Sequence, residues 1–250
     1  MSATRNAAHE RRLLFGAGIA GVLGALGWTI GDVLIFGHLA DRAAYPLLFQ
    51  THADRIDAGL AEHLVGVSHA RLIAGALFAV FSIPFYLIGL RHLWQGIRGA
   101  GRTWTWPTMT LLFLGFAWSP LPHAAFCFVG ATYQAVLASD PAAHGALLDL
   151  AAEFRHVLLL TYVPAVACQL AGMLAFSLAV TTGRTVYPRG FALTANPVTL
   201  LLVTAGIPHL IGGAAGAALG SAAFNTAWLL VYLQSLWLTR RKADAHGLPR

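Results

Sequence analysis

Charged residues are scarce in this chain. Asp, Glu, Lys and Arg together make up only 10% of its 250 residues, whereas 57% are hydrophobic. In an ordinary soluble domain about a quarter of the residues are charged, and they keep its surface hydrated. The shortage of charge excludes a water-soluble domain of this length. It indicates an all-α, polytopic membrane protein that forms a single membrane domain over residues 1–250.

Several chemical motifs are also missing. The two cysteines, Cys127 and Cys168, lie in apolar segments and form no C-x-x-C, so we interpret them as small buried residues rather than a redox pair. The chain has no G-x-S-x-G, no Walker-type loop and none of the histidine clusters of membrane di-iron oxygenases. These absences argue against the corresponding hydrolase, nucleotide and di-iron sites.

Lys and Arg together number 16 and Asp and Glu only 10, which leaves a net charge of +6. In a soluble protein this excess would suggest nucleic acid as a partner. Here the bases cluster between apolar segments, so they are topology signals, and we expect no nucleic acid. Positive loops face the cytoplasm, which predicts an inner-membrane protein with both termini inside. The bases on that side are Arg5, Arg11, Arg12, Arg91, Arg98, Arg102, Arg184, Arg189, Arg240, Arg241, Lys242 and Arg250.

Six apolar segments reach the roughly 20 residues that a membrane-spanning helix needs. The predicted spans are residues 13–38, 69–93, 105–138, 154–182, 197–220 and 222–239. Within the third, Pro120 and Pro122 remove backbone donors and predict a kink or a break. Residues 40–66 are amphipathic and predict one or two helices at the outer membrane surface.

Every predicted span sends a polar group towards the outer side. An ionisable group at mid-membrane costs about 2.5–3.5 kcal/mol on insertion scales, so such groups usually face a cavity or one another. We therefore predict an outer polar site. Its candidate catalytic residues are Asp32, His123, Glu153, His156 and His209. Its candidate substrate-binding residues are Trp28, His69, Arg71, Trp118, Arg155 and Asn225.

Two spacings favour this site. Trp28 and Asp32 are four residues apart on one helix face, and Glu153 and His156 are three apart on another. A carboxylate beside an imidazole can make it a usable acid or base. The simpler reading is that these groups make structural hydrogen bonds or extend to water near the interface.

The histidines are also compatible with a metal or haem site, although the sequence does not identify a cofactor. Zinc needs three or four ligands, and the candidates are His69, His123, His156 and His209. The Ser119-x3-His123 spacing is similar to that of alkaline-ceramidase-type hydrolases, but the last span lacks their H-x3-H. Six-helix b-type cytochromes place haem ligands at both membrane depths, whereas these four histidines lie towards one side.

Glycines form a stripe near the N-terminus. Gly16–Gly21 reads GAGIAG, which matches the dinucleotide pattern G-x-G-x-x-G, but no strand precedes it. Close helix packing explains the stripe better, and Gly212, Gly216 and Gly220 predict a second one.

Residues 70–97, ARLIAGALFAVFSIPFYLIGLRHLWQGI, and 120–133, PLPHAAFCFVGATY, resemble a family of uncharacterised six-span bacterial integral membrane proteins. The shared pattern falls on Gly31–Asp32, Arg71–Leu72, His92 and His123–Ala124. The resemblance carries no activity. It supports the six-span expectation and implies a role for Asp32, Arg71, His92 and His123.

The leading hypothesis is an integral membrane enzyme with an acid/base site near the outer leaflet. Its partners would be membrane lipids, and its substrate a lipid-soluble molecule such as an isoprenoid or a sterol-like lipid. One alternative is a small-molecule transporter or binding protein, although the internal repeats typical of transporters are not evident. The other is a haem- or metal-binding protein that uses the four histidines named above.

Overall fold

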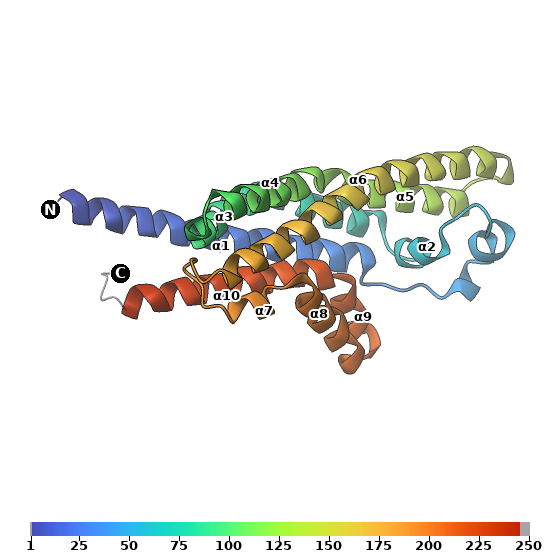
Figure 1. Ribbon diagram of the computed structural model, residues 1–250. Coiled ribbons are helices and arrows are strands. Elements are labelled where there is room, and N and C mark those ends of the chain that lie inside the picture. Colours follow the sequence, from blue (N-terminus) through green and yellow to red (C-terminus); the bar gives the residue numbers. More distant parts are fainter. Residues whose placement is uncertain (1, 246–250) are drawn as a thin grey trace.

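The computed structural model describes residues 2–245, with side chains from residue 9 to 242 apart from residues 207 and 214. All regular structure in this part of the chain is helical, which confirms the all-α prediction (Figure 1). In chain order the segments are α1 (Ser2–Phe36), η1 (Arg42–Ala44), η2 (Leu47–Thr51), α2 (Ala58–Leu64), α3 (His69–Ile97), η3 (Arg98–Ala100), α4 (Arg102–Trp118), α5 (Pro120–Ala138), α6 (Pro141–Thr181), α7 (Phe191–Thr194), α8 (Pro197–Ile211), α9 (Gly213–Ser221) and α10 (Ala223–Ala245).

Four helical segments within the described residues are long and apolar enough to cross a membrane, and the bent pair of α9 and α10 gives up to five. The four are His9–Phe36, His69–Ala100, Arg102–Ala138 and Pro141–Thr181. Several long apolar helices are what a multi-pass membrane protein requires. The six spans predicted from the sequence are not all present as continuous crossings.

The difference lies in the predicted span 197–220. Gly212 and Gly213 have φ values of 68° and 57°, and the chain turns there, so α8 ends and α9 begins. At 15 residues α8 is about 22 Å long, less than the roughly 30 Å of a hydrocarbon core. A further break, with a bend of 74°, separates α9 from α10. The described residues therefore show four to five helices of spanning length, and the predicted six are not shown.

Two other boundaries refine the predictions. The long third span is interrupted at Ser119, where Pro120 starts α5, as the proline pair predicted. Helix α6 begins at Pro141 rather than near residue 154, because Asp140 caps it by accepting a hydrogen bond from the Ala142 N–H. Its 41 residues extend about 61 Å, so α6 is longer than a bilayer core requires.

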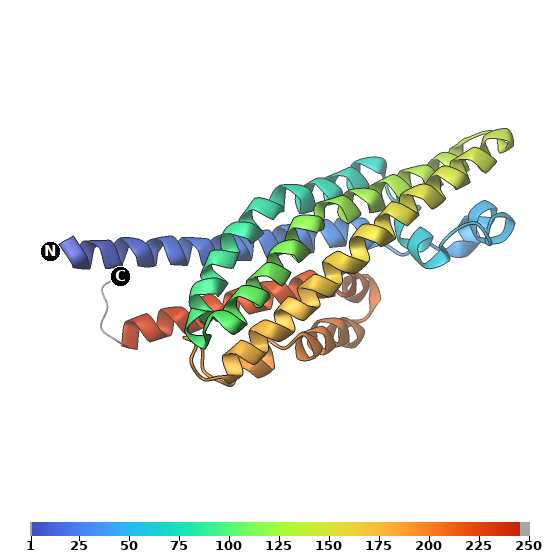
Figure 2. The same cartoon turned by 45° about the horizontal axis from the view of Figure 1, so that its top comes forward.

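Residues 40–66 form three short helical segments, which we call the cap segment. Its side chains Leu48 and Leu64 are fully buried in a cluster that includes Val136 of α5 and Leu148 of α6. The side chain of Gln134 holds its end by donating to the Leu64 and Val67 carbonyls. The start of α1 and the end of α10 lie at one end of the bundle, the termini end, and the cap segment lies at the opposite, cap end (Figures 1 and 2).

Helix α1 packs through its glycines. A side chain at Gly24 or Gly27 would strike Tyr86 or Ser82 of α3, and one at Gly21 would strike Tyr232 of α10. The GAGIAG run thus lies in a helix whose glycine face admits two neighbours, as the packing interpretation predicted.

Candidate functional site

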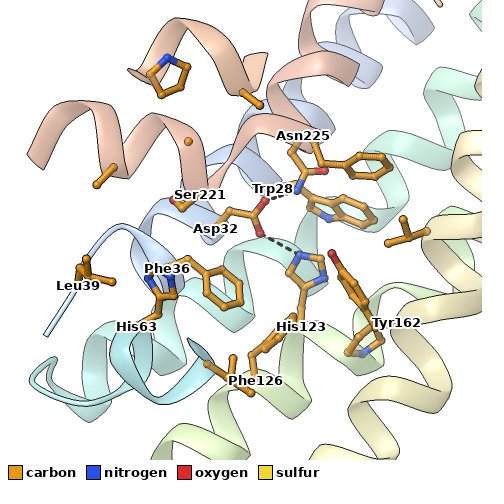
Figure 3. A pocket seen from close by; sticks show the side chains of 18 of the residues that line it. Trp28, Asp32, Phe36, Leu39, His63, His123, Phe126, Tyr162, Ser221 and Asn225 are labelled. Atoms are coloured by element: carbon orange, nitrogen blue, oxygen red, sulfur yellow. Dashed lines mark hydrogen bonds and ion pairs between the residues drawn. The ribbon is translucent and has the colours of Figure 1, made fainter. Parts of the chain in front are cut away.

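A cavity of about 820 Å³ opens at the cap end of the bundle (Figure 3). Helices α1, α5, α6, α8, α9 and α10 contribute to its walls. The walls are mainly apolar. Large residues among them are Trp28, Phe36, Phe126, Leu158, Tyr162, Val166, Pro208 and Phe224. The α8–α9 wall contributes several residues without bulk, namely Ala205, Gly212, Gly213, Gly216, Ala217 and Gly220.

Three buried polar side chains meet in this apolar surrounding. Asp32 Oδ1 lies 3.3 Å from His123 Nε2, and Asp32 Oδ2 accepts a hydrogen bond of 2.5 Å from Asn225 Nδ2 (Figure 3). Asp32, His123 and Asn225 are 7%, 8% and 3% exposed. They come from α1, α5 and α10, so the folded bundle is needed to assemble them.

The proton positions of this group are constrained. His123 Nδ1 lies 2.9 Å from the Ser119 carbonyl, which can only accept, so Nδ1 donates there. Only Nε2 is then free to change its protonation state, and it faces Asp32. A hydrogen bond between the two side chains requires one proton, carried either by His123 Nε2 or by Asp32. Asn225 donates to the other oxygen of Asp32 and so directs that proton towards His123.

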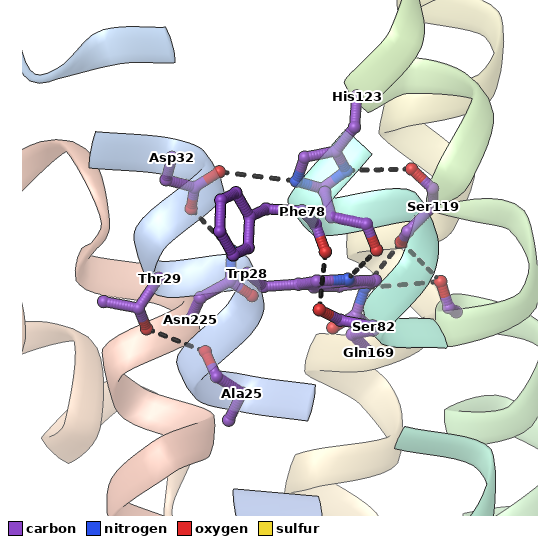
Figure 4. A network of polar contacts seen from close by, with 12 residues as sticks. Ala25, Trp28, Thr29, Asp32, Phe78, Ser82, Ser119, His123, Gln169 and Asn225 are labelled. Carbon is purple, nitrogen blue, oxygen red and sulfur yellow. Dashed lines mark hydrogen bonds and ion pairs between the residues drawn. The ribbon is translucent and has the colours of Figure 1, made fainter. Parts of the chain in front are cut away.

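A second layer of hydrogen bonds holds His123 in place (Figure 4). Ser119 Oγ donates to the Gly115 carbonyl and accepts a bond of 3.0 Å from Gln169 Nε2. Gln169 Oε1 accepts a bond of 3.0 Å from the Trp228 indole N–H. These partners tie α4, α5, α6 and α10 together beneath the Asp32–His123 pair.

Aromatic side chains close the bundle below the cavity. Trp28, Tyr86, Phe116, Trp228 and Tyr232 are each at most 1% exposed. Their rings pack on one another, with Tyr86 stacked on Phe116 at a centroid distance of 4.3 Å and Trp28 edge-on to Tyr86 at 4.6 Å. We call these five residues the aromatic layer. The layer belongs to a buried hydrophobic core that runs from Trp28 at the cavity to Leu93 and Ile97 of α3.

Charged groups lie at the mouth of the cavity. Arg155 of α6 forms an ion pair with Asp57 of the cap segment, with Nη2 and Oδ2 3.0 Å apart. His63 lines the mouth and its Nδ1 donates to the His38 carbonyl at 2.8 Å. His209 of α8 also lines the cavity, and this residue is exposed.

The structure therefore brings together six of the candidate residues. Around the cavity lie Trp28, Asp32, His123, Arg155, His209 and Asn225. The other five lie elsewhere: His69, Arg71, Trp118, Glu153 and His156 are not among its lining residues. Glu153 and His156 are exposed on the surface of α6, and Trp118 is 44% exposed.

Arg71 has a structural partner instead. Its guanidinium donates to the Leu34 and Val33 carbonyls at 2.8 and 3.1 Å, which satisfies the last turn of α1.

The four histidines proposed as metal or haem ligands do not converge. Among the described residues, no group of three or more His, Cys, Asp or Glu side chains is placed to hold a metal ion. His123 is buried in the bundle, while His69, His156 and His209 are exposed on α3, α6 and α8. This arrangement does not support a shared zinc or haem site.

Several residues of the site were not predicted. Gln169, Ser119 and Trp228 support the pair, and Tyr162, Asp57 and His63 line the cavity. A signal for Gln169 exists, because an amide in the middle of an apolar span needs a buried partner. The sequence does not indicate which partner.

No curated protein and no solved structure matches the chain. Residues 14–242 match one protein family, whose description is a family of unknown function. Because the match covers most of the chain, including the residues that form the cavity, the protein belongs to this family, DUF6796.

Proposed function

We propose that this protein is an integral membrane enzyme that performs acid/base chemistry on a lipid-soluble substrate. The observation that carries the proposal is the Asp32–His123 pair, buried in a large apolar cavity that the aromatic layer closes on one side. An apolar cavity with a few convergent polar groups is the usual form of a small-molecule site. Its volume of about 820 Å³ suits an isoprenoid or a sterol-like lipid.

The proposed roles follow from the contacts. The proton between Asp32 and His123 is the one available for transfer, so the pair can give a proton to a substrate atom or take one from it. Asn225 holds Asp32 in place as a positioning residue. At the mouth, Arg155 and His209 are placed to orient the polar end of the substrate, and the Trp28 ring packs 5.0 Å from the His123 ring.

The aromatic layer favours this proposal over solute transport. A transporter needs a route by which its substrate reaches the opposite side. Below the Asp32–His123 pair the bundle is filled by Trp28, Phe116 and Trp228, which are fully buried. The cavity is therefore suited to binding a molecule that enters and leaves on one side.

The proposal includes an orientation. Arg91, Arg98, Arg102, Arg184 and Arg189 lie in or near connections at the termini end, which places that end in the cytoplasm by the positive-inside rule. The cap end and the cavity would then lie at the outer leaflet of a bacterial inner membrane. Cysteine labelling from each side of the membrane tests this assignment.

The function is tested with purified protein in liposomes that contain a total lipid extract from bacterial membranes. Mass spectrometry should detect a lipid that the wild-type protein consumes and that Asp32→Asn leaves unchanged. Val166→Trp should also block conversion, because Val166 lines the cavity. Val163→Trp is the matched control on the same helix, since Val163 is 59% exposed and does not line the cavity. If the wild-type and Asp32→Asn reactions give identical lipid profiles, the proposal is wrong.

A further inference from the structure

A second group of buried polar side chains lies at the termini end. His92 Nε2 of α3 is 2.8 Å from Ser235 Oγ of α10, and Ser235 Oγ is 2.7 Å from the Tyr187 hydroxyl. His92 Nδ1 donates to the Leu14 carbonyl of α1 at 3.0 Å. His92 and Ser235 are 5% and 0% exposed. Nothing in the proposed enzyme site requires this chain of contacts.

The space between the two polar groups contains hydroxyls without partners. Among the described residues, the buried side-chain atoms that make no hydrogen bond are the Tyr86, Thr226 and Tyr232 hydroxyls and Asn225 Oδ1. Buried hydroxyls are almost always hydrogen-bonded, so such atoms call for an explanation. Tyr86 and Tyr232 are fully buried, and their ring centroids lie 6.1 Å apart.

Helix α10 carries polar residues in order along the bundle, from the cavity to the termini end. Asn225, Tyr232 and Ser235 follow one another at spacings of seven and three residues, which keeps them on one face of the helix. Asn225 bonds to Asp32, and Ser235 contacts His92. The ten residues from Asn225 to Ser235 span about 15 Å, and Thr226 and Tyr232, whose hydroxyls have no partner, lie in that interval.

Helix α1 gives the same order independently. Its Leu14 carbonyl contacts His92, a side chain at Gly21 would strike Tyr232, one at Gly24 would strike Tyr86, and Asp32 follows. The 18 residues from Leu14 to Asp32 rise about 27 Å, close to the thickness of a bilayer core. The polar groups therefore extend from the termini end to the cavity.

We propose that these groups form a proton-transfer file between the termini end and the Asp32–His123 pair. Each Tyr hydroxyl would accept a proton on its oxygen and release its own proton to the next group, with water molecules bridging the longer steps. For each proton that enters beside Tyr187 and His92, one reaches Asp32, and every hydroxyl ends with the proton count it began with. The aromatic layer would thus block solutes while it passes protons.

The file is tested without any substrate, so its failure is distinct from failure of the proposed enzyme activity. The full chain is placed in liposomes that contain a pH-sensitive dye, and proton uptake is driven by a potassium gradient with valinomycin. The wild-type protein should acidify the lumen faster than protein-free liposomes. Tyr232→Phe and Tyr86→Phe, and independently Ser235→Ala at the termini end, should lower the rate to that of protein-free liposomes.

Tyr133→Phe is the matched control. Tyr133 is also a buried tyrosine, but its hydroxyl accepts a hydrogen bond from the Asp57 N–H at the cap end. This variant should conduct like the wild type. Because the Tyr86 and Tyr232 hydroxyls make no hydrogen bond to another protein group, their removal should lower the thermal unfolding temperature less than Ser235→Ala does, whereas a structural role would require a comparable decrease. Wild-type uptake no faster than that of protein-free liposomes, or Phe variants that conduct like the wild type, would overturn the proposal.

Discussion

Asp32 Oδ1 of α1 lies 3.3 Å from His123 Nε2 of α5, and each side chain has a second partner that fixes its orientation. Asn225 donates to the far oxygen of Asp32, and the Ser119 carbonyl accepts from the far nitrogen of His123. The orientation of the pair is thereby fixed by groups of the protein itself. Such preorganisation is what acid/base catalysis requires, since a group that must first reorient contributes less.

Removal of either member of this pair should destabilise the protein. Asp32→Ala or His123→Ala leaves one buried ionisable group without its partner, which typically costs about 3–5 kcal/mol. The Asp32→Ala/His123→Ala double variant should be less unstable than the sum of the two single effects. Thermal unfolding in detergent, arranged as a double-mutant cycle, measures this coupling. Strictly additive effects would show that the two side chains act independently.

Gln169→Leu should lower stability by about 1–3 kcal/mol, because it leaves the buried Trp228 N–H without an acceptor. The additional change Trp228→Phe removes that donor and should restore part of the loss. Unfolding temperatures of the single and double variants give the answer. A Gln169→Leu protein as stable as the wild type would show that the amide is not needed in the bundle.

Arg71 should prove structural. Arg71→Ala removes two charge-assisted hydrogen bonds to the end of α1, and the expected cost is about 1–3 kcal/mol. Arg71→Lys can replace only one of the two bonds and should recover part of the stability. Neither variant should change which lipid is consumed in the conversion assay that tests the proposed function. An altered substrate preference in Arg71→Lys would instead support the substrate-binding role predicted from the sequence.

Arg155→Ala should loosen the cap segment with little effect on global stability. The Arg155–Asp57 pair is partly exposed, and such pairs contribute roughly 0–1 kcal/mol. Hydrogen exchange should increase in α2, whose first turn Asp57 caps, and remain unchanged in α10. Arg155→Lys, which keeps the charge, is the control. Equal exchange in α2 of the wild-type and Arg155→Ala proteins would contradict an anchoring role.

Tyr187 should make stability depend on alkaline pH. Burial raises the pKa of its hydroxyl above the ordinary value, so the folded protein keeps it protonated. Its contribution is complete below the pKa of the unfolded chain, about 10, and is lost as the pH rises above that value, because only the unfolded chain ionises there. Unfolding temperatures from pH 9 to about 11 should fall less steeply in Tyr187→Phe. Parallel curves for the two proteins would count against this effect.

The sequence predicted the long helices well because apolar length is a direct requirement of a bilayer. Helices α1 and α3, the later part of α6 and the α4–α5 break follow from apolar runs and prolines, whereas the Asp140 cap that starts α6 at Pro141 was not predicted. The Gly212–Gly213 break was not foreseen, since a glycine stripe in an apolar run reads as a packing face. Nothing in composition distinguishes a helix that crosses from two short helices that turn back.

The site was predicted only in part, because the sequence does not reveal which helix faces point inward. Asp32, His123 and Asn225 meet as a polar site requires, but Glu153 and His156 face away from the cavity. In a soluble helix the apolar stripe indicates which face is buried. In a membrane both the lipid-facing and the inward faces are apolar, so the sequence does not indicate which way α6 is rotated. Which residues are polar could be read from the sequence, but the direction in which the side chains of α6 point could not.

The cap segment carries one further consequence. Its ion pairs, Arg42–Glu62, Arg55–Asp149 and Arg155–Asp57, all lie on partly exposed side chains at the cap end, whereas Asp32 and His123 lie buried beneath them. Ions in solution screen exposed charges over about 8 Å at physiological ionic strength and act far less on buried ones. A higher ionic strength should therefore weaken the contacts that hold the cap segment at the mouth of the cavity and leave the Asp32–His123 pair unaltered.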